Sequence, residues 1–216
     1  MTCKVFLGLA LSAALLASLS CGGGGGSRDT SGDVTLNAPP VGGFDGFIAN
    51  TLPVPSVFEN TVPGIVVGDL FDIESRGFLT FDIGLLPPPP AVVRGAVLEI
   101  EQWQVTGAPY PQLGSIWIDH VNLGITFDFL DYDLAPLDAA FATVTSNDAL
   151  TTYSVDVRSQ IGADQVAGRT RSSFRLRFNF PGGHLVNGNT DSADFNDAEN
   201  HGGSGLVPKL TIVYSP

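Results

Sequence analysis

The sequence is poor in positive charge, cysteine and long apolar runs. Its 216 residues include 10 lysines and arginines against 22 aspartates and glutamates, so the formal net charge is −12. A nucleic-acid-binding protein needs a basic surface, which this composition excludes. Only 15% of the residues are charged and 44% are hydrophobic, which excludes a disordered acidic tail and a coiled coil. The 26 glycines and 15 prolines predict many turns and few helices.

The N-terminal apolar run is too short for a membrane span. It covers 15 residues, Val5 to Leu19, and follows the single charge of Lys4, whereas a spanning helix needs about 20 residues. These features predict a secretory signal over residues 1–20. The junction Ser18-Leu19-Ser20-Cys21, followed by glycines, is similar to the signal of bacterial lipoproteins, in which the cysteine is lipidated. The alternative is ordinary cleavage near Ser20 that leaves a free cysteine.

The resemblance to lipoproteins implies a location and a tether. In such proteins a glycine directly after the lipidated cysteine goes with export to the outer membrane, so we expect a bacterial cell-envelope protein, anchored at the outer membrane or secreted. Residues 21–43 are expected to form a glycine-rich tether. Removing residues 1–20 leaves nine basic and 22 acidic residues, a formal charge of −13. If Cys21 carries lipid, the folded part has no disulfide and depends on its core.

From Phe44 onward, apolar and polar residues alternate with the two-residue period of half-buried strands. The stretch from Gln102 to Val105 breaks this period, which predicts a β-bulge or a sheet crossing. The one helix-like stretch is Ser159–Val166. We therefore predict one all-β domain over 44–216, an antiparallel β-sandwich of jelly-roll type. The predicted strands include 65–70, 78–83, 96–101, 116–119, 153–158, 174–180 and 209–214.

Several of these segments resemble the DNRLRE domains, which are β-sandwich modules of bacterial and archaeal surface proteins related to carbohydrate-binding modules. The resemblance spans residues 64–216 and rests on structural motifs, so it implies a fold and no particular binding residue. The literal DNRLRE string is missing, and the Pro87–Pro90 link and the acidic segment 127–138 are elaborations of this chain. The matching motifs are RGFLTFDI (76–83), AVVRGAVLEI (91–100), YSVDV (153–157), FRLRF (174–178) and PKLTIVY (208–214).

One stretch near the C-terminus concentrates oxygen ligands of the kind that calcium prefers. It departs from the EF-hand pattern, because Ser192 replaces the glycine at position six and the carboxylate falls at position 13. The alternative is a solvated loop in which Asn and Asp cap turns. A second acidic run, Asp128 to Asp138, is expected to be a loop that packs its aromatic residues against the domain. The candidate calcium ligands are Asn187, Asn189, Asp191, Asp194, Asn196, Asp197 and Glu199.

Aromatic rings beside polar groups form the usual platform for sugars, because the C–H faces of a sugar stack on flat rings. Trp117 is out of phase with Ile116 and Ile118, so it is a candidate for an exposed ring; the alternative is that the tryptophans fill buried positions. The arginines could bind an acidic polysaccharide or pair with Glu99 or Glu101. The candidate carbohydrate-binding residues are Trp103, Trp117, Asp119, His120, Arg175 and Arg177.

The sequence offers little for catalysis. His120, His184 and His201 lack the spacing of a metal site, and the string HGGSG (201–205) lacks the nucleophile-elbow pattern. We therefore expect no catalytic residue. The favoured function is non-catalytic binding at the cell surface, with a polysaccharide as partner, the membrane contacted only through lipid and no nucleic acid bound. The alternatives are a structural surface lipoprotein and a polysaccharide-cleaving enzyme, which would bring two carboxylates, or an acid and a histidine, together in a pocket.

Overall fold

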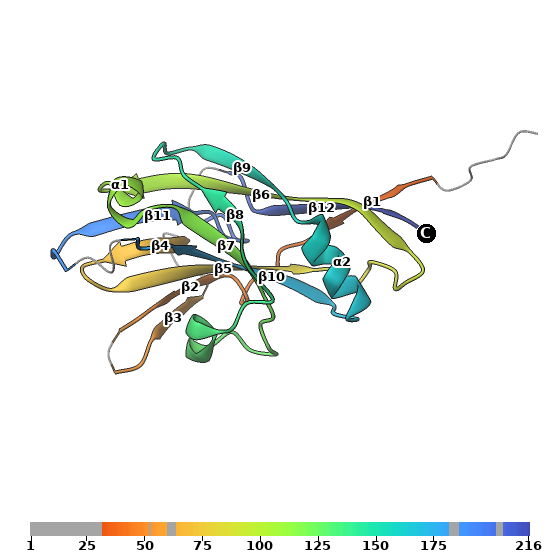
Figure 1. The fold of residues 1–216 in the computed structure, drawn as a ribbon, viewed down its shortest axis with the longest axis horizontal. Helices are drawn as coiled ribbons and strands as arrows, with labels where there is room; N and C mark the ends of the chain where they lie inside the picture. The colour runs from red at the N-terminus through yellow and green to blue at the C-terminus, as the bar shows by residue number, and fades with distance from the viewer. Residues whose placement is uncertain (1–31, 52, 60–63, 182–185, 202–204) are drawn as a thin grey trace, which may run out of the picture. The chain divides into compact units, whose positions relative to one another are not determined.

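Twelve strands and two short helices are present in the part of the chain that the computed structural model describes, namely residues 32–51, 53–59, 64–181, 186–201 and 205–216 (Figure 1). The predicted signal and Cys21 lie outside these residues. The described residues belong to one compact unit. The elements are β1 (Val34–Ala38), β2 (Gly46–Ala49), β3 (Ser56–Glu59), β4 (Ile65–Leu70), β5 (Glu74–Asp82), β6 (Val92–Thr106), α1 (Pro109–Leu113), β7 (Ile116–Val121), the 3-10 helix η1 (Phe129–Asp133), β8 (Asp138–Val144), β9 (Thr151–Asp156), α2 (Arg158–Val166), β10 (Arg171–Phe178), β11 (Thr190–Phe195) and β12 (Lys209–Ser215).

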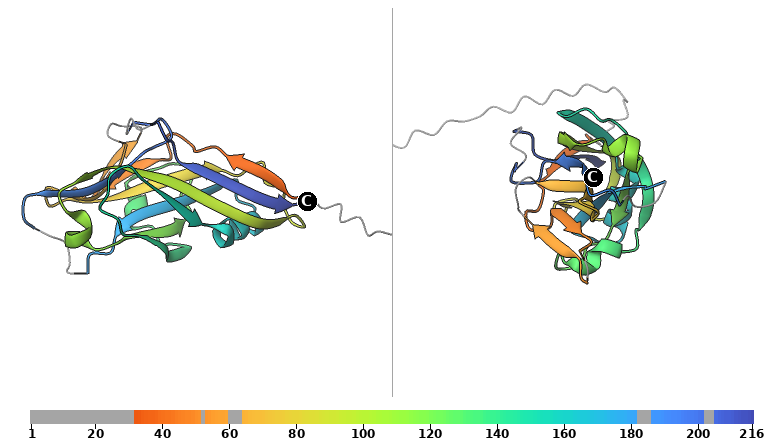
Figure 2. Two further views of the ribbon diagram at one scale, coloured as in Figure 1. Left: turned by 90° about the horizontal axis from the view of Figure 1, so that it is seen from above. Right: turned by 90° about the vertical axis from the view of Figure 1, so that its left-hand side faces the viewer.

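The strand order confirms the predicted all-β jelly-roll fold. Every pairing between named strands is antiparallel. One layer has the order β1-β12-β6-β9 and the other β5-β10-β7-β8 (Figures 1 and 2). Among these eight strands, every step along the chain except that from β7 to β8 passes to the opposite layer. This is jelly-roll connectivity, in which the first strand lies beside the last.

Four further strands are inserted into this frame. The β2–β3 hairpin extends the second layer beyond β5, while β4 and β11 pair with each other and join the start of β5 to the end of β6. Where β6 changes partner from β12 to β11, Asp194 and Phe195 pair with Gln104 and Gln102, which leaves Trp103 as an extra residue. The irregularity predicted for 102–105 is therefore a β-bulge.

The core lies between the two layers and is built from the inward residues of the alternating strands. Leu98 of β6, Phe174 of β10 and Ile212 of β12 are fully buried in it, as their phase predicts. The predicted helix is α2, which begins at Arg158 and buries Ile161 in the same core. Figures 1 and 2 show α2 in the half of the domain where the C-terminus lies. The described residues include no cysteine, so this part of the chain depends on apolar burial between the two layers.

The predicted tether is too long at its C-terminal end. Residues 34–38 form β1, which pairs with β12 over Leu210–Tyr214. The chain then stays bound to β5, since the Val41 amide donates to the Thr80 carbonyl and the Asp82 amide donates to the Pro39 carbonyl. Only Ala38 of β1 is buried. An edge strand that is held mainly by backbone hydrogen bonds has little apolar pattern, which is why composition alone assigned it to the linker.

Candidate functional site

The outer face of the second layer is covered by the acidic segment between β7 and β8. A separate apolar cluster of Ile48, Phe78 and Val121 lies on this face, and Phe127 and Tyr132 pack onto it. Asp128 caps η1 by accepting the Leu130 amide, while Asp131 accepts the Asp128 amide. The segment is thus a packed insertion with capping acids, as we expected.

Two of the predicted sugar-binding residues are buried beneath this segment. Asp119 is fully buried and Arg175 nearly so. Both Nε and Nη2 of Arg175 donate to Asp119, at 3.0 and 2.7 Å, and its Nη1 donates to the Tyr132 and Leu134 carbonyls. Arg177 donates a further bond of 2.7 Å to Asp119. This corrects two expectations: Asp119 and Arg175 are occupied by protein groups, and the arginines pair with Asp119 instead of Glu99 or Glu101.

The charge cluster also sets the protonation of its carboxylate. Burial favours the neutral form of Asp119, but hydrogen bonds from Arg177, from the Ala140 amide and from Arg175 outweigh it and lower the pKa of Asp119. Burial lowers the pKa of Arg175. Ala140 adopts a left-handed backbone conformation, with φ of 48°, and its amide lies 2.8 Å from Asp119. The cluster is therefore a structural ion-pair network that links β7 to its two neighbours, β10 and β8.

The two tryptophans are both partly buried. Trp117 of β7 lies directly opposite Arg177 of β10 in the strand pairing. The guanidinium carbon of Arg177 is 4.9 Å from the centroid of the Trp117 ring. One face of the indole is thus shared with a cation. Trp103 lies at the β-bulge of β6. The two tryptophans therefore lie on different strands, β6 and β7, which do not pair with each other.

Two open cavities flank helix α2 and share Ser159 and Gln160 at its start. The larger, of about 760 Å³, lies against Pro89–Val93 and Phe141, and also contains Asp156 and Arg158. The smaller, of about 440 Å³, lies against the β7–β8 connection. It is lined by His120, Leu137, Asp138, Ser159, Gln160, Ala163, Ala167 and Arg169. Both volumes fall in the usual range for small-molecule sites, and both linings combine apolar surface with hydrogen-bond donors and acceptors.

Of the predicted sugar-binding residues, His120 lines the smaller of these two cavities. Strand alternation places it on the opposite face of β7 from Trp117 and Asp119, where it is 2% exposed. Its Nε2 is 2.9 Å from Oδ2 of Asp164 on α2, and Oδ1 of Asp164 accepts a bond of 2.8 Å from Arg169. Gln160 donates a hydrogen bond to Asp138, and both residues line this cavity. Asp164, Arg169 and Gln160 had no distinguishing pattern in the sequence, because only the docking of α2 brings them to β7.

The predicted calcium ligands do not surround one point. Asn187 and Gly188 donate their backbone amides to Asp72 at the β4–β5 turn, and Asp191 accepts the Ala108 amide. Asn196 donates to Glu101. The six residues of β11 lie between the two groups of candidates and span roughly 20 Å. A single ion therefore cannot contact both ends, and the set as predicted is wrong.

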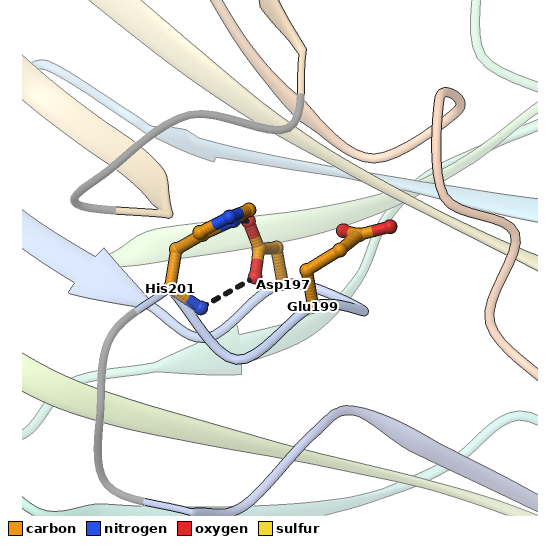
Figure 3. A group of neighbouring side chains, drawn as sticks. All are labelled: Asp197, Glu199 and His201. Atoms are coloured by element: carbon orange, nitrogen blue, oxygen red, sulfur yellow. Dashed lines mark hydrogen bonds and ion pairs between the residues drawn. The ribbon is translucent and has the colours of Figure 1, made fainter.

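Only the residues after β11 converge. Ligand atoms of Asp197, Glu199 and His201 lie within 4.8 Å of one another (Figure 3). The Asp197 carboxylate accepts a hydrogen bond of 2.9 Å from the backbone amide of His201. It also forms a hydrogen bond with Nδ1 of the His201 imidazole. The hydrogen bond to Asp197 raises the pKa of His201. The sequence pattern included Asp197 and Glu199 but had not joined His201 to them.

Comparison with known proteins adds no relative. No protein-family model matches the chain, and no curated protein matches its sequence. Among the described residues, no helix has both the length and the apolar character needed to cross a bilayer.

Proposed function

We propose that this chain is a lipid-anchored module of the bacterial cell envelope that binds carbohydrate without cleaving it, in the cavities beside α2. The observation that carries the proposal is the pair of cavities that meet at Ser159 and Gln160. A sugar presents hydroxyl groups that both donate and accept, together with apolar C–H faces. Asp138 and Arg169 supply an acceptor and a donor, and Phe141 supplies an aromatic surface.

The experiment is a glycan array probed with the soluble chain, residues 22–216, which lacks the cysteine that would carry lipid. Two substitutions fill the cavities from exposed or half-exposed helix positions. Gly162→Leu blocks the larger cavity, where a Cβ meets open space, and Ala163→Leu blocks the smaller one. Leucine has a high helix propensity, so α2 is expected to remain folded. Loss of binding by at least tenfold in either variant, with an unchanged melting temperature, supports the proposal.

The control is Thr152→Leu, which adds the same side chain at an exposed position of β9. It is expected to bind as the parent does. If Trp117→Ala or Trp103→Ala abolishes binding while both cavity variants retain it, the ligand lies on an aromatic platform and the proposed location is wrong. If no glycan is bound, a structural surface lipoprotein becomes the better interpretation.

One observation favours a second candidate, a polysaccharide-cleaving enzyme. The His120–Asp164 pair brings an acid and a histidine together at a cavity wall. An imidazole oriented by a carboxylate can serve as a general base. New chain ends released from a bound polysaccharide by the parent, and not by His120→Gln, would establish cleavage. We favour binding because the His120–Asp164 bond also fastens α2 to β7, and Asp164 is held by Arg169 as well.

A further inference from the structure

A second site lies away from α2, where the chain leaves β11. Asp197, Glu199 and His201 come from one loop, and their ligand atoms are mutually within 4.8 Å. Figure 3 shows the three side chains above the same short turn. A cluster of acids alone is no site, because acids gather on many solvated loops. A metal site also needs an independent feature that requires a ligand at the same place.

Asp45 supplies that feature. It precedes β2, is 0% exposed, and reaches the same loop, since its Oδ2 accepts the Ala198 amide at 2.6 Å. Its Oδ1 is buried and has no hydrogen-bond partner in the described part of the chain. An uncompensated buried carboxylate oxygen is costly, and Asp197 and Glu199 add like charges close by.

The backbone makes room for these acids to gather. The Glu199 carboxylate lies against Gly42, at the place where a Cβ would stand. Any larger residue at position 42 would displace Glu199. Three carboxylates are therefore packed around the Asp197–His201 turn, two of them on buried residues. A bound cation would offset their repulsion and pair with the orphaned oxygen of Asp45.

We propose that Asp197, Glu199 and His201, whose ligand atoms lie within 4.8 Å of one another, bind one divalent transition-metal ion of the Zn²⁺ or Mn²⁺ class. Asp45, which reaches the same loop at Ala198, moves in as the fourth ligand when the ion binds. Calcium takes six to eight oxygen ligands, whereas an imidazole among carboxylates suits a first-row transition metal. On binding, His201 exchanges its hydrogen bond with Asp197 for a bond to the metal. The site ties the loop after β11 to the entry of β2, so the metal links two segments that are far apart in the sequence.

The test uses metal-free, tag-free residues 22–216. Equilibrium dialysis with Zn²⁺ and Mn²⁺ is expected to show one ion bound per chain, and the bound ion is expected to raise the melting temperature. Glu199→Gln and His201→Gln alter an exposed and a half-exposed side chain, so they should fold normally and bind the metal at least tenfold more weakly. Asp45→Asn keeps an oxygen for the Ala198 amide; it should bind more weakly too, while the metal-free protein stays as stable as the parent or becomes more stable.

The matched control is Asp33→Asn, which removes one negative charge at an exposed position before β1 and should leave metal affinity unchanged. Failure of the parent to bind either ion, or unchanged affinity in Glu199→Gln and His201→Gln, would overturn the site. Tighter binding of Ca²⁺ than of Zn²⁺ and Mn²⁺ would overturn the metal class. None of these results depends on the cavities beside α2, so the two proposals can fail separately.

Discussion

Asp119 shows how single buried charges organise this domain. It is fully buried, and the salt bridges to Arg175 and Arg177 are both 2.7 Å long. Arg175 is itself only 5% exposed in its side chain, so it depends on Asp119 for its countercharge. Such a buried ion pair stabilises the fold little more than apolar residues of similar size would. Removal of one partner, however, leaves an isolated buried charge, which is strongly destabilising.

The first prediction concerns this pair. Asp119→Asn is expected to lower the free energy of unfolding by about 3–5 kcal/mol, because the buried guanidinium of Arg175 loses its carboxylate. Urea denaturation measures the change. Asp133→Asn is the control, since Asp133 is 83% exposed and pairs with Arg76 at the surface; its cost should stay below about 1 kcal/mol. Equal costs for the two variants would show that the Asp119 network is unimportant.

The second prediction concerns pH. Burial raises the pKa of Asp194 to about 6, from an ordinary value of 3.8. Between about pH 4 and pH 6, the folded state therefore keeps a proton on Asp194 that the unfolded chain has lost. Above pH 6 the buried carboxylate is charged, and it destabilises the domain. This destabilisation is relieved as the pH falls from 6 towards 4. Asp194→Asn should raise the unfolding free energy at pH 8 by about 1–2 kcal/mol and flatten the pH profile, as measured by urea titrations. A steeper profile in the variant would contradict this.

At the scale of elements, the packing of β4 over β5 is unusually close. A Cβ on Gly77 of β5 would collide with the methyl groups of Ile65 and Val67 on β4. Gly77→Ala should therefore force the β4–β11 pair outward and cost about 1–3 kcal/mol. Gly95→Ala in β6, where a Cβ meets open space, is the matched control and should be neutral or slightly stabilising. Thermal unfolding of both variants measures the difference in stability. Similar melting temperatures for Gly77→Ala and Gly95→Ala would disprove the close contact between β4 and β5.

The edge strand β1 gives the next prediction. Chains that begin at residue 32 and at Phe44 differ by β1 and by the contacts of Pro39 and Val41 with β5. The chain from Phe44 is expected to melt at a lower temperature and to self-associate, because β12 then presents unpaired backbone groups. Light scattering during size-exclusion chromatography measures the association. If the two chains behave alike, β1 contributes nothing to the domain.

At the scale of the whole molecule, the proposed location at the cell envelope rests on Cys21, which lies outside the described residues. We predict that the parent fractionates with membranes when expressed in a bacterium, and that Cys21→Ser is exported but released in soluble form. Mass spectrometry of the mature N-terminus should find an acylated cysteine at position 21 in the parent. An N-terminus at Met1, or membrane association that persists in Cys21→Ser, would show that the signal is not that of a lipoprotein.

The sequence by itself determined the fold class. The signals that it used are local, because a residue's neighbours in sequence set which face it occupies. They are the alternation in strands such as β10 and β12, the broken phase at Trp103 and the helical stretch at α2. It missed β1, since an exposed edge strand is held by backbone pairing and carries little apolar pattern. It also assigned Arg175 to the surface, because alternation predicts the face of a sheet but not what covers that face.

Only the tertiary structure decided which polar residues meet. His120 and Asp164 are 44 residues apart, and Asp45 and Ala198 are 153 apart, so no spacing along the chain could have paired them. Conversely, the closely spaced Asn189 and Asp197 are separated by the extended strand β11. Burial, pKa shifts and cavities arise where distant strands pack together, and they follow from register and layer order, which are properties of the folded chain as a whole.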